Sequence, residues 1–246
     1  DIIKRPHGTW AKAPGMLVLT PLLTGLVGTI FARSMGSGIV PILLATAAAM
    51  LIIRILKSSI APAISAGVLP ISLNITSWYY PASLLVGLIL LAAISLVWPR
   101  FVPLPPVRTA SDVADDVTEE TPSTYSWLPF FLVFLVGTAI LAEATGWRLI
   151  LFPPLIVIGF EMFAHADVCP WVKKPLLLPV ACTLSALIGV ALVTTFGGAP
   201  LAVISSAACG ILILRLFDLH VPPALAVGLL PFIIPAVDYR FAASVG

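Results

Sequence analysis

The sequence has little charge: 10% of its 246 residues are Asp, Glu, Lys or Arg, while 60% are hydrophobic. Soluble domains carry about 25% charged residues, so this composition excludes an ordinary soluble domain and is typical of a membrane protein with several spans. No block of basic residues interleaved with aromatic ones occurs, which argues against a nucleic-acid partner. The net charge of +2 indicates nothing further about partners.

The sequence also lacks the residue patterns of metal sites, disulfide or redox pairs and catalytic sites. The three cysteines, Cys169, Cys182 and Cys209, form no CxxC pair, and His165 and Asp167 have no companions at metal-ligand spacing. We therefore expect neither a metal site nor a cofactor. The sequence also contains no phosphate-binding loop and no pattern of nucleophile, base and acid, so we expect no enzymatic activity and no catalytic residues.

Apolar runs of membrane-spanning length are abundant. A transmembrane helix needs about 20 apolar residues, because it rises 1.5 Å per residue and the hydrocarbon layer is about 30 Å thick. The runs predict long helices at about 14–32, 39–56, 81–98, 127–144, 175–195 and 200–217. Shorter segments of about 16 residues, each containing proline, lie at 60–75, 149–164 and 222–236.

The chain repeats itself at an offset of 161 residues. The segment 54–70, RILKSSIAPAISAGVLP, aligns without a gap with 215–231, RLFDLHVPPALAVGLLP. Roughly 17 residues are identical over about 62 aligned positions, and they include Trp, Lys, Arg, Gly and Pro. The pattern predicts a tandem duplication, with a first repeat over 1–98, an acidic Pro/Thr-rich linker over 99–126 and a second repeat over 127–246.

A shorter echo occurs within the second repeat. PPLIVIG at 153–159 matches PPALAVG at 222–228, which indicates that each repeat consists of a span, a short segment and a span, followed by a second set of the same three. In the 161-residue register Asp1 corresponds to Met162, and Gly246 falls early in a final span. We therefore expect further segments before Asp1 and after Gly246.

The predicted fold is an all-α membrane protein of two homologous helical bundles, each with long transmembrane helices and short, proline-started helices. Counting positive charges does not decide whether the short segments cross the membrane or re-enter. Their length, roughly 24 Å of helix, favours re-entrant or broken half-helices that begin at Pro222, Pro153 and about Pro62 and are buried in protein. Small residues in TGLVG (24–28) and LSALIG (184–189) predict close helix packing.

The start of such a short helix suits a small anion. Proline is favoured in the first helical turn, the N–H groups after it (about Ala224–Ala226) lack helical partners, and the helix dipole adds positive charge. Transporters place broken helices in this way near the membrane midplane. The candidate substrate-binding residues are Arg54, Ser59, Pro62 and Ala63 in the first repeat and Arg215, His220, Pro222, Pro223, Ala224 and Leu225 in the second.

Some of these residues also have purely structural explanations. Arg215 and Arg54 either supply a fixed positive charge to the anion or anchor a helix end at the membrane surface. His220 either has a functional role, relaying a proton or donating to the anion, or is a hydrogen-bonded residue at the interface. Asp218 is expected to pair with Arg215 or Lys57 rather than to carry a proton.

Three stretches of the second half carry a resemblance: PPLIVIG (153–159), KPLLLPVACTLSALIGV (174–190) and DLHVPPALA (218–226). They resemble the HPP family of integral membrane proteins, over most of 127–236 and, through the duplication, over 10–98. The family motif is a His-Pro-Pro-Ala run, whereas here Val221 separates His220 from the Pro pair, and the first copy has neither. The resemblance implies four main spans and nitrite transport, which is a role of some members.

The residues and the resemblance together predict a transporter or channel for a small, nitrite-like inorganic anion. It would lie in a plasma or inner membrane, or in a plastid membrane. Its partners would be the lipid bilayer, the anion, and either further copies of itself or a larger membrane complex. The alternative is a non-transporting structural subunit of such a complex, in which the short segments only pack.

Overall fold

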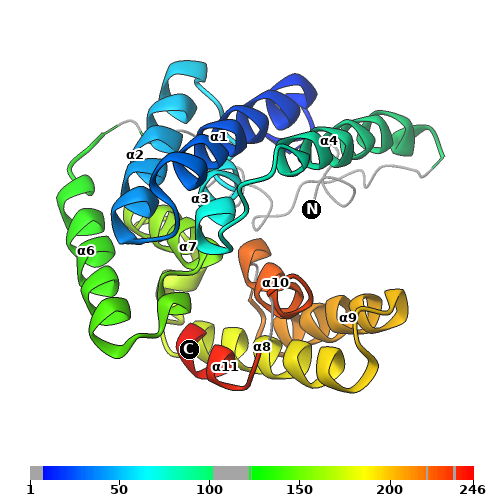
Figure 1. The fold of residues 1–246 in the computed structure, drawn as a ribbon. Coiled ribbons are helices and arrows are strands. Elements are labelled where there is room, and N and C mark those ends of the chain that lie inside the picture. Colours follow the sequence, from blue (N-terminus) through cyan, green and yellow to red (C-terminus); the bar gives the residue numbers. More distant parts are fainter. Residues whose placement is uncertain (1–7, 102–121, 123, 220, 235–236) are drawn as a thin grey trace. The chain divides into compact units, whose positions relative to one another are not determined.

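A computed structural model describes residues 8–101, 122, 124–219, 221–234 and 237–246 (Figure 1). Over these residues the fold is helical and contains no strand, as predicted. It divides into two compact units: unit 1 comprises Asp1–Val133 with Gly159–Cys169, and unit 2 comprises Phe134–Ile158 with Pro170–Gly246. Most of the predicted linker lies outside the described residues.

Unit 1 is organised around α1 (Pro14–Met35). Helices α2 (Ile39–Leu56), α3 (Ala63–Ser72) and α4 (Tyr79–Val97) all pack against α1, and α3 also packs against α2. A 3-10 turn, η1 (Trp98–Arg100), follows α4. Helix α3 is deeply buried, and its side chains with no exposed surface are Ala63, Ile64, Val68 and Ile71.

Unit 2 is organised around α8 (Leu177–Phe196). Helices α9 (Pro200–Leu216), α10 (Pro222–Leu229) and α11 (Arg240–Val245) pack against α8, and α10 also packs against α9. The 3-10 turn η4 (Leu230–Phe232) continues α10. Between α4 and α8 the chain forms α6 (Leu128–Thr145), η2 (Arg148–Leu151), α7 (Pro153–Ala164) and η3 (Pro170–Lys173).

The long helices are compatible with a membrane protein. Among the described residues, α1, α2, α4, α6 and α8 have 18 or more residues and are apolar enough to cross a membrane. The sixth predicted span forms α9, which has 17 residues and a length of about 26 Å. Helices α1 and α8 end at Gly36 (φ 74°) and Gly197 (φ 65°), since glycine adopts this left-handed conformation without steric cost.

The three short helices begin where the proline pattern predicted. Helix α7 starts at Pro153, α10 starts at Pro222, and α3 starts at Ala63 with Pro62 as its N-cap. They have 12, 8 and 10 residues, fewer than the 16-residue segments suggested, because the prolines and turns at each end take up the remainder. At 1.5 Å per residue each measures about 12–18 Å, well short of the hydrocarbon thickness.

Glycine pairs hold two of these short helices against a long helix. A Cβ on Gly28 of α1 would clash with the backbone carbonyl of Gly67 in α3, and a Cβ on Gly189 of α8 would clash with the carbonyl of Gly228 in α10. In both pairs the backbones themselves are in contact, which only glycine permits. The close packing predicted for residues 24–28 and 184–189 is therefore confirmed.

Candidate functional site

The chain enters α3 and α10 through corners with the same backbone geometry. Lys57, after α2, and Asp218, after α9, have positive φ angles of 47° and 50°. The N–H of Lys57 donates to the Arg54 carbonyl (3.1 Å), and the N–H of Asp218 donates to the Arg215 carbonyl (3.2 Å). Left-handed turns of this kind commonly end helices. The candidate residues thus follow equivalent turns in the two units.

In unit 1 the approach to α3 is held by polar side chains. The Thr20 hydroxyl donates to Ser58 Oγ (2.8 Å), and Ser58 Oγ accepts a bond from the Ile60 N–H (3.3 Å). The indole N–H of Trp10 donates to the carbonyl of Ser59 (2.9 Å). Thr20 and Ser58 are both buried, so these bonds satisfy groups that are shielded from water. The predicted site residue Ser59 therefore uses its carbonyl to fix the chain.

The first turn of α3 is satisfied in the same way. The Thr24 hydroxyl, on the buried face of α1, donates to the carbonyl of Ala63 at 2.6 Å. Further along α3, the Tyr80 hydroxyl donates to the carbonyl of Ala66 at 2.7 Å. Side chains from α1 and α4 thus bond to the backbone of this short helix.

The approach to α10 in unit 2 has a different lining. At the 161-residue offset, Thr20 and Ser58 correspond to Ala181 and Leu219, which are buried and apolar. Trp171 corresponds to Trp10, and its indole nitrogen is buried without an acceptor among the described residues. The residue in register with Ser59 is His220, which lies outside the described residues, so the predicted role of His220 is untested.

Ser185 corresponds to Thr24, and its environment differs most. Its side chain is 2% exposed, and its hydroxyl has no hydrogen-bond partner in the part of the chain that the structure describes. Elsewhere on α10, the buried Ser206 hydroxyl donates to the carbonyl of Gly228 at 2.7 Å. Unit 2 therefore holds a buried polar group beside α10 that the described residues do not satisfy.

The expectation that the N–H groups at the start of α10 are free is wrong for Ala224, and the first N–H of α3 is bonded as well. The Ala224 N–H donates to the Val221 carbonyl (3.0 Å), and the Ala63 N–H donates to the Ile60 carbonyl (3.1 Å). The first two residues of α10 are both prolines and have no N–H. The prolines that start this helix therefore remove two backbone donors that an anion could use. The helix dipole still favours a negative charge at this end.

The predicted arginines lie at the ends of the preceding helices. Arg54 is exposed, and its guanidinium carbon lies 4.6 Å from the centre of the Tyr125 ring, a cation–π contact. Arg215 is exposed and makes no ion pair within the described residues. Both stand in the last helical turn, where a positive charge is favoured by the dipole. These positions fit the anchoring explanation as well as the anion-binding one.

Asp218 does not pair as predicted. Its carboxylate accepts a bond from Lys174 Nζ at 3.0 Å, and the same ammonium group donates to the carbonyls of Phe217 (3.2 Å) and Asp218 (2.8 Å). Neither Arg215 nor Lys57 forms an ion pair among the described residues. Lys174 reaches this corner from 44 residues away in sequence, a contact that local spacing could not reveal.

The other predicted residues of α10 are packed to different degrees. Pro222 is exposed, Pro223 and Leu225 are half-buried, and Ala224 is fully buried. A Cβ added at Gly210 of α9 would lie 3.2 Å from a methyl carbon of Leu225. Leu225 therefore faces α9 and serves packing.

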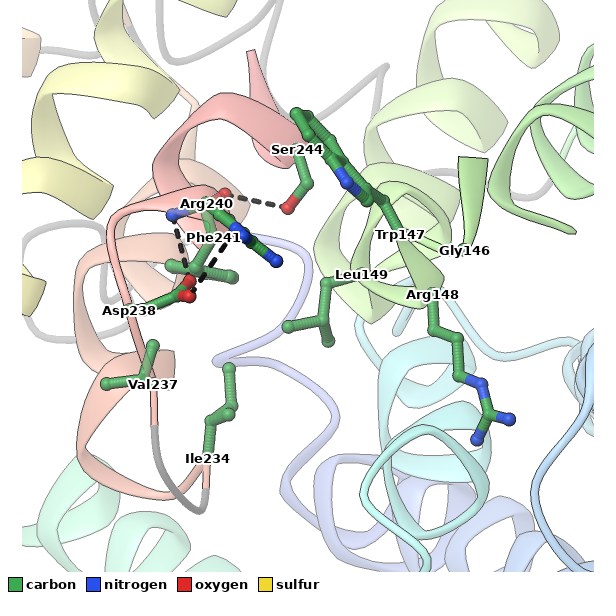
Figure 2. A pocket seen from close by; sticks show the side chains of 10 residues that line it. All are labelled: Gly146, Trp147, Arg148, Leu149, Ile234, Val237, Asp238, Arg240, Phe241 and Ser244. Atoms are coloured by element: carbon green, nitrogen blue, oxygen red, sulfur yellow. Dashed lines mark hydrogen bonds and ion pairs between the residues drawn. The ribbon is translucent and has the colours of Figure 1, made fainter. Parts of the chain in front are cut away.

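Unit 2 also contains a cavity of about 310 Å³ between η2 and α11, which the sequence did not predict (Figure 2). Its lining residues are Gly146, Trp147, Arg148, Leu149, Ile234, Val237, Asp238, Arg240, Phe241 and Ser244. The sequence signal that could have pointed to it is the Trp-Arg pair directly after a predicted span.

One of the two arginines that line this cavity is paired with a carboxylate. The Asp238 carboxylate lies 3.8 Å from Arg240 Nε and accepts a bond from the Arg240 backbone N–H at 2.9 Å. Figure 2 shows these two side chains facing each other while Arg148 extends away from them. Exposed ion pairs of this type contribute about 0–1 kcal/mol, and Arg240 already has a carboxylate partner. The cavity is therefore a weak candidate for a transport site.

Two comparisons of sequence and one of structure bear on identity. No protein-family model matches the chain, and neither a curated protein nor a solved structure gives a significant match. The resemblance to the HPP family accordingly stays a prediction. Among the described residues no group of three or more His, Cys, Asp or Glu side chains could hold a metal ion.

Proposed function

We propose that this chain is a membrane transporter or channel for a small inorganic anion. The observation that carries the proposal is the set of short apolar helices that begin at or directly after a proline, α3, α7 and α10. They occur together with five helices, among the described residues, that are long enough to cross a membrane. A helix of 8–12 residues that packs among such helices ends partway through the hydrocarbon layer. Backbone of this kind is tolerated in membranes where it is buried in protein or lines a pathway.

The anion is proposed to be nitrite-like on the strength of the HPP resemblance, and the two bundles are proposed to be tandem copies. Support for the copies comes from recurring geometry. Three features of unit 1 have a counterpart 161 residues later in unit 2. The turn at Gly36 corresponds to the turn at Gly197, and the corner at Lys57 corresponds to the corner at Asp218. The contact of Gly28 with Gly67 corresponds to the contact of Gly189 with Gly228. A single ancestral bundle of four helices, duplicated, would produce this recurrence.

A structural subunit of a larger membrane complex is the second candidate. It is favoured by the satisfied donors at the start of α3, where the Thr24 hydroxyl and the Ala63 N–H are both bonded within the chain. A helix start with no free donor has little to offer an anion apart from its dipole. The two candidates differ in one measurable property, which is anion flux.

Flux is measured with the purified protein in proteoliposomes, with nitrite, nitrate and chloride compared in parallel. We expect flux above that of empty liposomes, and we expect Arg215→Gln to lower flux per folded molecule because it removes a positive charge next to the α10 approach. The matched control is Arg100→Gln, which removes an exposed arginine that follows α4. Flux no greater than that of empty liposomes would favour the structural subunit. Equal flux in the two variants would show that Arg215 does not contribute to transport and only anchors the end of its helix.

A further inference from the structure

We infer that the two short-helix starts are not equivalent, and that only the start of α10 in unit 2 binds the small anion, with the Ser185 hydroxyl as a donor. This inference rests on the proposed function and assigns its site. The start of α3 in unit 1 is a structural copy whose donors are already used within the chain.

The position of Ser185 follows from the glycine contacts. Helices α8 and α10 touch at Gly189 and Gly228, and the Ser185 carbonyl oxygen and Cβ lie 3.2 and 3.6 Å from the Cβ position of Gly228. Ser185 is one helical turn before Gly189, and in a helix the Cα–Cβ bond tilts toward the N-terminus. This tilt directs the Ser185 side chain from Gly228 toward the first turn of α10, which contains Ala224.

The arrangement in unit 1 supports this placement directly. There Gly28 contacts Gly67, and Thr24, one turn earlier on α1, bonds to the carbonyl of Ala63 in the first turn of α3. Moving four residues back along α1, from Gly28 to Thr24, corresponds to moving four residues back along α3, from Gly67 to Ala63. Helices α1 and α3 therefore run parallel. At the 161-residue offset, Thr24 corresponds to Ser185 and Ala63 to Ala224.

The chemistry at the start of α10 suits an anion. Its two prolines carry no N–H and the Ala224 N–H is bonded to Val221, so the first three residues of α10 offer no backbone donor to a ligand and a side-chain donor gains importance. Ser185 provides a hydroxyl that is 2% exposed and has no hydrogen-bond partner among the described residues, and the helix dipole favours negative charge at the same end. The carboxylate on the approach to α10, that of Asp218, is paired with Lys174.

The ligand must also be small. Backbone contact between α8 and α10 at the glycine pair leaves no room for a bulky group one turn away. At the equivalents of Thr20 and Ser58 the lining is apolar, and the buried polar groups without a partner among the described residues of this region are the Ser185 hydroxyl and the Trp171 indole N–H. An inorganic anion such as nitrite, nitrate or chloride meets these requirements.

Stability of the purified protein without added anion gives the first test. Thr24→Ala should lower the midpoint of thermal unfolding by about 2–4 °C, because it removes a buried hydrogen bond. Ser185→Ala should leave the midpoint unchanged or raise it, since this hydroxyl has no hydrogen-bond partner among the described residues. A drop in Ser185→Ala that matches the drop in Thr24→Ala would mean that the hydroxyl is bonded within the protein and would overturn the inference.

Anion binding and flux give the second test, with nitrite, nitrate and chloride as probes. In the wild type the anion should raise the unfolding midpoint, and Thr24→Ala should keep this shift and its flux per folded molecule. Ser185→Ala should lose the shift and lower flux by about tenfold, the effect expected for one hydrogen bond to a charged group. Equal effects of the two substitutions would overturn the inference alone. No anion effect in the wild type would overturn the proposed function as well.

Discussion

Replacing Gly28 by alanine tests the packing that organises unit 1. The new methyl group would lie 2.7 Å from the carbonyl carbon and 3.0 Å from the Cα of Gly67, and closer still to its carbonyl oxygen. These are backbone atoms of a buried helix, so they cannot rotate away as a side chain would. Overpacking typically costs about 1–3 kcal/mol, and a backbone clash belongs at the upper end. Alanine is favoured over glycine within a helix by about 0.5–1 kcal/mol, which leaves a net loss of about 2 kcal/mol.

The assay is thermal unfolding of the purified protein in detergent, compared with a matched control. A loss of about 2 kcal/mol corresponds to a midpoint lowered by about 4–8 °C for a protein of this size. Gly87→Ala in α4 is the control, because nothing lies within 4 Å of the added methyl group and only the helix preference changes. Its midpoint should rise slightly. If Gly28→Ala is as stable as Gly87→Ala, α1 and α3 do not meet as the structure has them.

Two further substitutions test single bonds. Lys174→Met should lower the free energy of unfolding by about 1 kcal/mol, because the bonds to the Asp218 corner are lost. The difference from wild type should shrink at high salt, because the ion pair is partly exposed. An unchanged chemical-denaturation midpoint at low salt would contradict this prediction. Tyr80→Phe should cost about 0.5–1.5 kcal/mol through loss of the 2.7 Å bond to the Ala66 carbonyl, and denaturation that matches the wild type would show that the bond contributes nothing.

The helices were predictable because hydrophobic run length and turn residues determine them locally. The run at 39–56 became α2 with the same bounds, and the prolines at 153 and 222 became the first residues of α7 and α10. These signals lie within a few residues of the structure that they determine. The small-residue clusters also predicted close packing, since few other reasons exist for glycine inside an apolar helix.

The hydrogen bonds of the candidate site were not predictable in the same way. Whether the Ala224 N–H is free depends on the φ and ψ angles of the residues before the prolines, which sequence spacing does not specify. The partner of Asp218 depends on where Lys174, the residue after η3, lies in space, and this position is set by the tertiary fold. The difference between Thr24 and Ser185 was visible as a conservative change in the alignment, but its meaning required the geometry of both helices.

The corners at Lys57 and Asp218 have a consequence for engineering the stability of this protein. A non-glycine residue in the left-handed region costs about 1–2 kcal/mol, and glycine in an ordered segment costs about 0.5–1 kcal/mol in entropy, so replacement by glycine should gain about 0.5–1 kcal/mol. At position 218 the gain would be offset by the lost contact with Lys174. At position 57 the side chain makes no hydrogen bond or ion pair within the described residues, so Lys57→Gly is the substitution of choice for a more heat-resistant variant.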